Sequence, residues 1–456
     1  MPPSLDQLKK WIESHRTQAK EEYFHFLRFR SISADPTYRK EMISCAEWVC
    51  RFLAEKAKMK AEIVETETYP LVYAEDLQAG KGAPTLLIYG HYDVQPVDPF
   101  ELWKSDPFEP TEREGKIFAR GAVDDKGQIY YAMLAVRCWK DLGYKLPVNL
   151  KFCIEGEEES SSIGLSKALP KLKERLKSDY LLVPDFDQYD RHTPSITLGA
   201  RGVMGLEVTL TGSKSDLHSG IHGGLAYNPN RALVQLLSQI WDEKGTVRIP
   251  GFYDDAIPVT SEQMKEFAFG FEQEKYTKEF GIEAFGWEKG KSPIEGNYFR
   301  PTLEINGISG GYAGPGLKTV IPAHASAKIS CRLVPNQDPR KVGKLISDFF
   351  KKHAVPGMKV EVKLHGGEEA FRGKSDSELA RAVSLAAEEV TGKNCKKVLS
   401  GASIPIVAQL MKTAGAEVVG MGYGLAEDNI HAPNEHFDWE RLEKGFLTVA
   451  RTLELL

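Results

Sequence analysis

Residues 85–94, TLLIYGHYDV, decide the fold that we expect for this chain of 456 residues. The first five form a largely apolar run, which is typical of a buried strand, and polar residues follow at once. Further buried strands are predicted at 148–154 and 180–183, with helices at 128–142 and 165–176 between the three strands. This alternation predicts an α/β domain with a mainly parallel sheet and helices on both faces.

A different pattern begins after residue 203. Its predicted strands, which alternate between apolar and polar residues, lie at 206–210, 302–306, 325–332 and 358–364, and its helices lie at 230–241 and 339–353. The resulting order, β-α-β-β-α-β, is that of a split βαβ sandwich with one open sheet face. Residues around 250–298 have weak periodicity and are interpreted as an insertion in this second domain.

The remaining segments match the first pattern. Two helices are predicted between residues 4 and 58, and three more at 377–390, 406–413 and 439–456, with a short strand at 416–420. We therefore predict that residues 204–368 form a second domain that interrupts a first domain made of residues 1–203 and 369–456.

The composition excludes fibrous and disordered proteins. Hydrophobic residues make up 42% of the chain and charged residues 27%, as in ordinary globular proteins. The net charge of −5 shows no basic excess, so we expect no nucleic-acid partner. The polar N-terminal stretch does not resemble a signal peptide, and no apolar run has the length of a membrane span, so we expect no membrane partner. Six scattered cysteines are interpreted as free thiols, and the expected location is cytoplasmic.

A histidine and an aspartate follow the first strand. Side chains two residues apart in an extended segment share a face, so His91 and Asp93 can point the same way. A carboxylate beside a histidine sets its tautomer and raises its basicity as a metal ligand. The alternative is a strand-end turn with a solvated aspartate.

Three further acidic motifs stand at comparable positions. Residues 120–127, RGAVDDKG, precede a helix, where acidic residues also serve as ordinary caps. Residues 155–160, EGEEES, leave a buried strand, and their carboxylates would repel one another unless a cation neutralises them, although a solvated loop is the common alternative. Asp185 ends the next strand, where an aspartate is structural more often than not.

These motifs are more informative together than singly. Successive βα units place His, Asp or Glu at the carboxyl ends of strands, where open α/β sheets bind ligands. Residues 427–435, EDNIHAPNE, add a histidine in a polar loop before the last helix. Histidine and carboxylates in this mixture suit zinc or a similar metal, and a shared carboxylate would allow two ions about 3.5–4 Å apart.

The ordered set of motifs resembles the signature of the two-metal exopeptidases that include carnosinases, aminoacylases and glutamate carboxypeptidases. It is most similar to the carnosinase-like dipeptidase branch, over nearly the whole chain. The resemblance implies two divalent metal ions per subunit, zinc first, with manganese or cobalt as alternatives. It also implies a metal-binding catalytic domain interrupted by a lid or dimerisation domain, and a cis peptide bond between Asp124 and Asp125.

The resemblance also implies a role for each motif residue. Asp124 would bridge both metals, and Asp93 would orient the ligand His91, with Glu158 as the general base. The remaining metal ligands would be Asp185 beside His91, and Glu159 and His431 at the second ion. Three consecutive glutamates stand where the family has two, so a register shifted by one residue stays open.

In the second domain, the resemblance implies substrate-binding residues. His218 would reach the active site of the partner subunit in a homodimer. Arg332 would bind the C-terminal carboxylate of the substrate, and Ser403 would assist this binding. Thr319 lies in another matching stretch, and His365 is either structural or part of the active site. From the residues alone, an ordinary loop histidine was the better interpretation of His218.

The predicted function is two-metal-dependent hydrolysis of dipeptides or short peptides that carry a free C-terminal carboxylate. One alternative is a deacylase of N-acyl amino acids, which needs the same metals and base. A second alternative is a catalytically silent binding or scaffold protein on the same fold, although no expected ligand or base is missing from the sequence.

Overall fold

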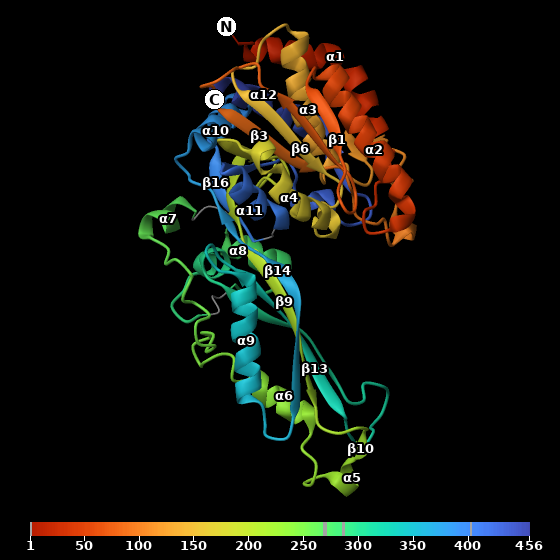
Figure 1. Cartoon of the computed structure of the whole chain (residues 1–456), viewed down its shortest axis with the longest axis vertical. Coiled ribbons are helices and arrows are strands. Elements are labelled where there is room, and N and C mark those ends of the chain that lie inside the picture. The colour runs from red at the N-terminus through yellow and green to blue at the C-terminus, as the bar shows by residue number, and fades with distance from the viewer. Residues whose placement is uncertain (1, 268–270, 285–287, 402–403) are drawn as a thin grey trace. The chain divides into compact units, whose positions relative to one another are not determined.

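The computed structural model describes residues 2–267, 271–284, 288–401 and 404–456. The chain, drawn in Figure 1, divides into two compact units. Unit 1 comprises Met1–Gly199, Arg372–Val398 and Ile404–Leu456, and unit 2 comprises Ala200–Phe371 and Leu399–Ser403. Leu399–Ser403 lies within the range that the sequence analysis assigned to the first domain.

A large sheet forms the centre of unit 1, with strand order β1-β2-β6-β3-β7-β17-β8-β15 and β16 beside β8. Its strands are β1 (Lys60–Val64), β2 (Leu71–Asp76), β3 (Thr85–His91), β6 (Asn149–Glu155), β7 (Tyr180–Val183), β8 (Ser195–Ala200), β15 (Phe371–Arg372), β16 (Lys396–Ser400) and β17 (Glu417–Met421). The predicted strands at 85–89, 148–154, 180–183 and 416–420 are confirmed within one or two residues at each end.

The sheet is mixed, and the prediction of a mainly parallel sheet holds only for its centre. Strands β6, β3, β7 and β17 are parallel neighbours. On one side β2 and β1 continue the sheet antiparallel, and on the other β8 is antiparallel to β17. The sequence analysis predicted neither β1 nor β2. The strand β1, KAEIV, is partly exposed and lacks an apolar run, whereas β2 begins with the buried run LVYA and was overlooked.

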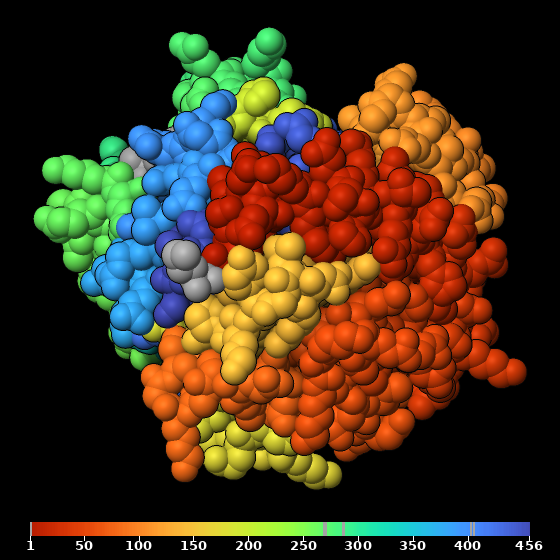
Figure 2. Space-filling view, turned by 90° about the horizontal axis from the view of Figure 1, so that it is seen from above, coloured from red at the N-terminus to blue at the C-terminus, as the bar shows by residue number. Residues whose placement is uncertain are grey.

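Helices lie on both sides of this sheet (Figure 1). They are α1 (Leu5–Leu27), α2 (Arg39–Arg51), α3 (Lys126–Asp141), α4 (Ile163–Leu176), α10 (Glu378–Thr391), α11 (Pro405–Ala414) and α12 (Trp439–Leu455). Helix α3 packs against α1, α12 and β3, so nearly all of it is buried, whereas α4 packs against α11. Figure 2 shows the N-terminal residues, in red, as a continuous part of the surface.

A small sheet joins two distant parts of unit 1. Strands β4 (Thr111–Arg113) and β5 (Lys116–Phe118) form a hairpin, and β18 (His436–Asp438) pairs antiparallel with β5. This pairing brings the segment just before α12 alongside the loop that precedes α3.

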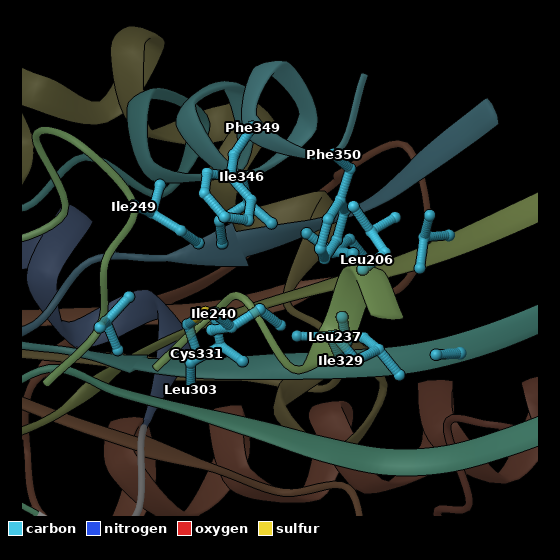
Figure 3. Close-up of a cluster of buried hydrophobic side chains, with 14 of the residues drawn as sticks. Leu206, Leu237, Ile240, Ile249, Leu303, Ile329, Cys331, Ile346, Phe349 and Phe350 are labelled. Carbon is cyan, nitrogen blue, oxygen red and sulfur yellow. The ribbon is translucent and has the colours of Figure 1, made fainter. Parts of the chain in front are cut away.

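Unit 2 is built on an antiparallel sheet of order β11-β13-β9-β14. Its strands are β9 (Gly202–Thr211), β11 (Thr302–Gly310), β13 (His324–Leu333) and β14 (Lys359–Glu368), and its main helices are α6 (Pro229–Leu237) and α9 (Pro339–His353). The chain order is the predicted β-α-β-β-α-β. Alternate residues of β9 and β13 pack with both helices into one core, of which Figure 3 shows part.

The rest of unit 2 consists of short elements. Strand β10 (Leu217–His218), followed by α5 (Ser219–His222), pairs with β12 (Val320–Ile321). The region predicted as an insertion contains α7 (Ser261–Glu266) and α8 (Gln273–Phe280). Within the described ranges of the whole chain, every helix is too short or too polar to cross a lipid bilayer.

Candidate functional site

His91 ends β3 and is completely buried in unit 1. Its Nε2 atom lies 3.2 Å from Oδ1 of Asp124 and 3.7 Å from Oδ2 of Asp185. The preceding residue, Gly90, leaves room for this arrangement, because a Cβ atom there would lie 2.6 Å from Oδ2 of Asp125 and 2.7 Å from Ile129. A side chain at position 90 would therefore displace the side chains of Asp125 and Ile129.

Asp93 connects the histidine to the glutamate run. One of its carboxylate oxygens lies 3.2 Å from Nδ1 of His91. The same carboxylate accepts hydrogen bonds from the backbone N–H groups of Glu158, at 3.2 Å, and Glu159, at 3.1 Å. A single buried side chain therefore holds both the imidazole and the turn that carries the two glutamates.

The three consecutive glutamates have different surroundings. Glu157 is buried and accepts hydrogen bonds from the hydroxyl of Thr68 and from the backbone N–H of Gly164, the latter at 2.8 Å. Glu158 Oε2 lies 4.0 Å from Nε2 of His91, and Glu159 Oε2 lies 3.2 Å from Nε2 of His431. The side chains that face the histidines are thus those of Glu158 and Glu159.

Asp124 lies between the two histidines. While its Oδ1 atom faces His91, its Oδ2 atom lies 2.8 Å from Nε2 of His431. Two groups of side chains have ligand atoms within 4.8 Å of one another: Asp124, Glu159 and His431 in one, and His91, Asp125 and Asp185 in the other. The structure therefore brings together all five residues that the resemblance implied as metal ligands. The Asp124–Asp125 peptide bond is cis, as the resemblance implied.

Sequence reasoning assigned no role to three other residues at this site. The buried Asp125 accepts a hydrogen bond from the backbone N–H of His91 at 3.1 Å. Gln95 donates from Nε2 to Oε2 of Glu159 at 2.9 Å. The third residue is Glu435, in the loop that also carries His431. A polar loop residue so far from its partners in sequence gives no signal of such a contact.

The carboxylate of Glu435 holds the loop that presents Asp124. Its Oε2 accepts from the backbone N–H of Gly121 at 2.9 Å and from Nη1 of Arg120 at 2.8 Å. Its Oε1 accepts from the backbone N–H groups of Val123, at 3.0 Å, and Asp124, at 3.1 Å. The side chains of Arg120 and Glu435 are almost fully buried, so this pair is shielded from solvent.

The electrostatics of the cluster favour bound cations. Burial raises the pKa of Glu158 to about 8, and the neighbouring carboxylates add to the effect. Hydrogen bonds to Asp124 and Glu159 raise the pKa of His431 to about 10. Burial alone would lower the pKa of His91, but Asp124 and Asp93 beside the ring outweigh it and raise that pKa well above its usual value. Because their pKa values are raised, Glu158, His431 and His91 retain protons in the metal-free site, and a divalent cation would replace these protons.

The donor set fits such a cation. Among the residues that the structure describes, Nε2 of His91 is buried without a hydrogen-bond partner, although it faces two carboxylates. Two imidazoles and several carboxylates are typical ligands of zinc and related ions. A carboxylate with one oxygen toward each histidine can serve two ions at once.

The remaining predicted residues belong to unit 2. His218 is exposed at the start of α5, where its Nδ1 accepts a hydrogen bond from the backbone N–H of Gly220 at 3.0 Å. The backbone oxygen of Thr319 accepts from Ser219 at 3.0 Å, so Thr319 and His218 are neighbours. Arg332 is on β13, and His365 on β14 lies 3.9 Å from Glu207. Ser403 lies outside the described residues.

Comparison with known proteins identifies the family. The model of peptidase family M20/M25/M40 matches residues 87–455, and the chain belongs to this family. The Beta-Ala-His dipeptidase of Homo sapiens is 30% identical over 474 residues, which cover 100% of this chain and 93% of that protein. The Cys-Gly metallodipeptidase dug1 of Schizosaccharomyces pombe is 30% identical over 465 residues, or 98% of this chain and 97% of that protein.

A solved structure agrees with these relatives. The M20 family metallo-carboxypeptidase Sso-CP2 from Sulfolobus solfataricus superimposes with a TM-score of 0.83 at 32% identity, covering 96% of this chain and 98% of that one. The resemblance to carnosinase-like dipeptidases that the motifs indicated is confirmed.

Proposed function

We propose that this protein is a two-metal-dependent dipeptidase that hydrolyses dipeptides or short peptides with a free C-terminal carboxylate. The observation that carries the proposal is the position of Asp124, with one carboxylate oxygen toward His91 and the other toward His431. Membership of a peptidase family and similarity to two dipeptidases support it.

In this proposal the five ligands are those that the resemblance implied. His91 and Asp185 would hold one ion, Glu159 and His431 would hold the other, and Asp124 would be shared between them. Zinc is the preferred ion, with manganese or cobalt as alternatives. When bound, the ions supply the Lewis-acid chemistry that polarises a carbonyl group and lowers the pKa of water.

Glu158 is the proposed general base. It takes a proton from the attacking water and passes it to the leaving amine. Its position supports this role, because its carboxylate borders the cluster and its backbone is held by Asp93. Arg332 would bind the C-terminal carboxylate of the substrate, and Ser403 would assist. His365 is a further candidate for contact with substrate.

Unit 2 supports a homodimer in which His218 acts on the partner subunit's substrate. His218 is on β10, which pairs with β12, and Thr319 directly precedes β12. The strand β12 ends shortly before β13 begins at His324, whereas Arg332 is near the other end of β13. Arg332 lies eight positions after His324 along the strand, a distance of about 27 Å. One small substrate cannot touch both ends, so a second copy of the chain must supply His218 if both residues are used.

Exposed apolar side chains support the same assembly. Leu225 is 83% exposed and Ile221 is 67% exposed, and both follow His218 closely in the sequence. Val234 on α6 and Ile308 on β11 are also largely exposed. Apolar surface of this kind is typical of protein–protein interfaces. In the proposal, His218 stabilises the oxyanion in the partner's site.

The proposed location is the cytoplasm. All six cysteines are free thiols, as expected for a reducing compartment.

The test is a substrate panel that compares dipeptides with N-acetyl amino acids, before and after exhaustive chelation and re-addition of zinc, manganese or cobalt. We expect dipeptide cleavage that is lost on chelation and restored by metal. Cleavage of N-acetyl amino acids alone would favour the deacylase, and no cleavage of either class would favour the silent scaffold. Full turnover with metal content near zero would contradict the mechanism.

A further inference from the structure

Unit 2 contains a cavity of about 640 Å³ that the proposed chemistry does not use. Its floor includes Arg201, Thr302 and Glu304, which lie at one end of the sheet. Its other walls come from the insertion and include Phe271 and Tyr276. The volume is within the range of pockets that bind small molecules.

The floor of the cavity is the open face of the sheet. Thr302 pairs with Arg332 across β11 and β13, and residues that pair directly across an antiparallel ladder have side chains on the same face. Their neighbours Leu303 and Cys331 belong to the core on the opposite face. Arg332, the proposed ligand of the substrate carboxylate, therefore stands on the same face as the cavity floor, next to Thr302.

A second contact connects the cavity with the segment expected to assist Arg332. The backbone N–H of Arg201 donates to the backbone oxygen of Ser400 at 3.3 Å. A Cβ atom on Gly401 would lie 3.8 Å from the side-chain amide of Asn297, another lining residue. Arg332 and Gly401 thus each lie beside a residue that lines the cavity, Thr302 and Asn297 respectively.

The lining combines one arginine and two glutamates with apolar side chains. Burial and the nearby Arg332 lower the pKa of Arg201 to about 10, which still leaves the guanidinium charged at neutral pH. Glu283 and Glu304 are the acidic groups of the lining. The insertion adds apolar side chains such as Ile294, and Ile282 is 56% exposed. The apolar side chains of the lining match an apolar side chain of the substrate, while Arg332 beside Thr302 would bind its carboxylate.

We propose that this cavity is the pocket for the side chain of the substrate's C-terminal residue, and that it selects dipeptides whose C-terminal residue is large and apolar. The inference rests on the proposed dipeptidase function and on the role of Arg332 within it. It assigns a purpose to the insertion: its residues form the apolar walls above the open sheet face.

The test fills the cavity from the insertion side, away from Arg332. Ile294→Trp should lower kcat/KM for Ala-Leu and Ala-Phe by about tenfold or more, which is the factor by which apolar pockets discriminate between substrates. The kcat/KM for Ala-Gly should stay within about twofold of the wild-type value. Ile257→Trp is the matched control: the same substitution in the same insertion, at a residue that is 58% exposed and outside the cavity lining. It should leave all three substrates unchanged.

A second variant distinguishes loss of the pocket from a general effect on folding. Tyr276→Ala removes a wall of the cavity and should raise KM for Ala-Phe more than for Ala-Gly. Circular dichroism and metal content should match the wild type in all variants. Equal loss on Ala-Gly and Ala-Phe, or no loss on either, would overturn the inference.

Direct binding separates this inference from the proposed function. Fluorine NMR of para-fluorophenylalanine measures binding without turnover. Broadening with the wild type that is lost in Ile294→Trp supports the pocket even if no dipeptide is cleaved. Dipeptide cleavage without such broadening would leave the function standing and overturn the pocket.

Discussion

Glu435 offers a direct test of how the site is held together. We predict that Glu435→Gln weakens metal binding and destabilises the protein although it alters no metal ligand. The carboxylate accepts four hydrogen bonds, two on each oxygen. An amide has only one acceptor oxygen, so in either orientation its NH₂ group faces two donors. One of those pairs includes the buried guanidinium of Arg120, and the other includes the N–H of Asp124.

The expected magnitude follows from this count. Breaking a buried ion pair by neutralising one partner costs about 3–5 kcal/mol of unfolding free energy, because the remaining charge stays buried. Loss of a residue that orients a metal ligand typically lowers metal affinity by about 10- to 100-fold. We expect both effects here.

Urea unfolding of the metal-free protein measures the first effect, and competition with a chromogenic chelator measures the second. The control is Glu440→Gln, in the same C-terminal segment, where the carboxylate is exposed and pairs with Lys444 at 2.7 Å. It should change stability by less than about 1 kcal/mol. Wild-type metal affinity in Glu435→Gln would refute the reasoning, since the loop of Asp124 would then be held by other contacts.

Three further predictions follow from the same geometry. Glu158→Gln should abolish turnover because an amide cannot accept a proton, and its metal content should stay nearly intact. Glu159→Gln should instead lower metal occupancy. If kinetics and metal analysis gave the reverse, the roles of the two glutamates would be exchanged. Mixing His218→Ala with Glu158→Gln under subunit exchange should restore about a quarter of wild-type activity, since about half the dimers are mixed and each has one intact site. No recovery after proven exchange would exclude action across the dimer. Metal-free protein should become less stable from about pH 6 to about pH 9. Burial raises the pKa of Glu158 to about 8, and the neighbouring carboxylates raise the pKa of His431 to about 10. Over this interval the folded protein therefore retains protons that the unfolded chain has lost, so a rise in pH favours unfolding. A thermal midpoint that rises over this interval would contradict the assignment.

The parts of the fold that were predictable are those with a clear apolar pattern, either a continuous apolar run or one apolar face. Residues 85–91 and 180–183 form buried strands because apolar runs have no other favourable place. The charged strand at 396–400, KKVLS, gave no such signal and was missed. The helix predicted at 230–241 ends at Leu237, where the chain turns toward Trp241, which pairs with Val247.

The site was predictable where its residues follow strands, and unpredictable where they depend on distant segments. His91 and Asp185 were found because strand ends point to ligands in this type of sheet. The role of Glu435 depends on backbone N–H groups more than 300 positions earlier in the chain, and no local pattern reports such a contact. The cavity of unit 2 also could not be predicted, because its walls come from a segment of weak periodicity.

The position of Glu435 in the chain has a consequence for how the protein is made. Synthesis proceeds from the N-terminus, so His91, Asp124 and Asp185 are made long before His431 and Glu435. Until the last segment emerges, the nascent chain carries the acidic residues of the proposed site without His431 and without the carboxylate that holds the loop of Asp124. In the proposed metal site, ion binding would therefore come late, and a chain released before residue 431 would lack the contacts that Glu435 makes with the loop of Asp124.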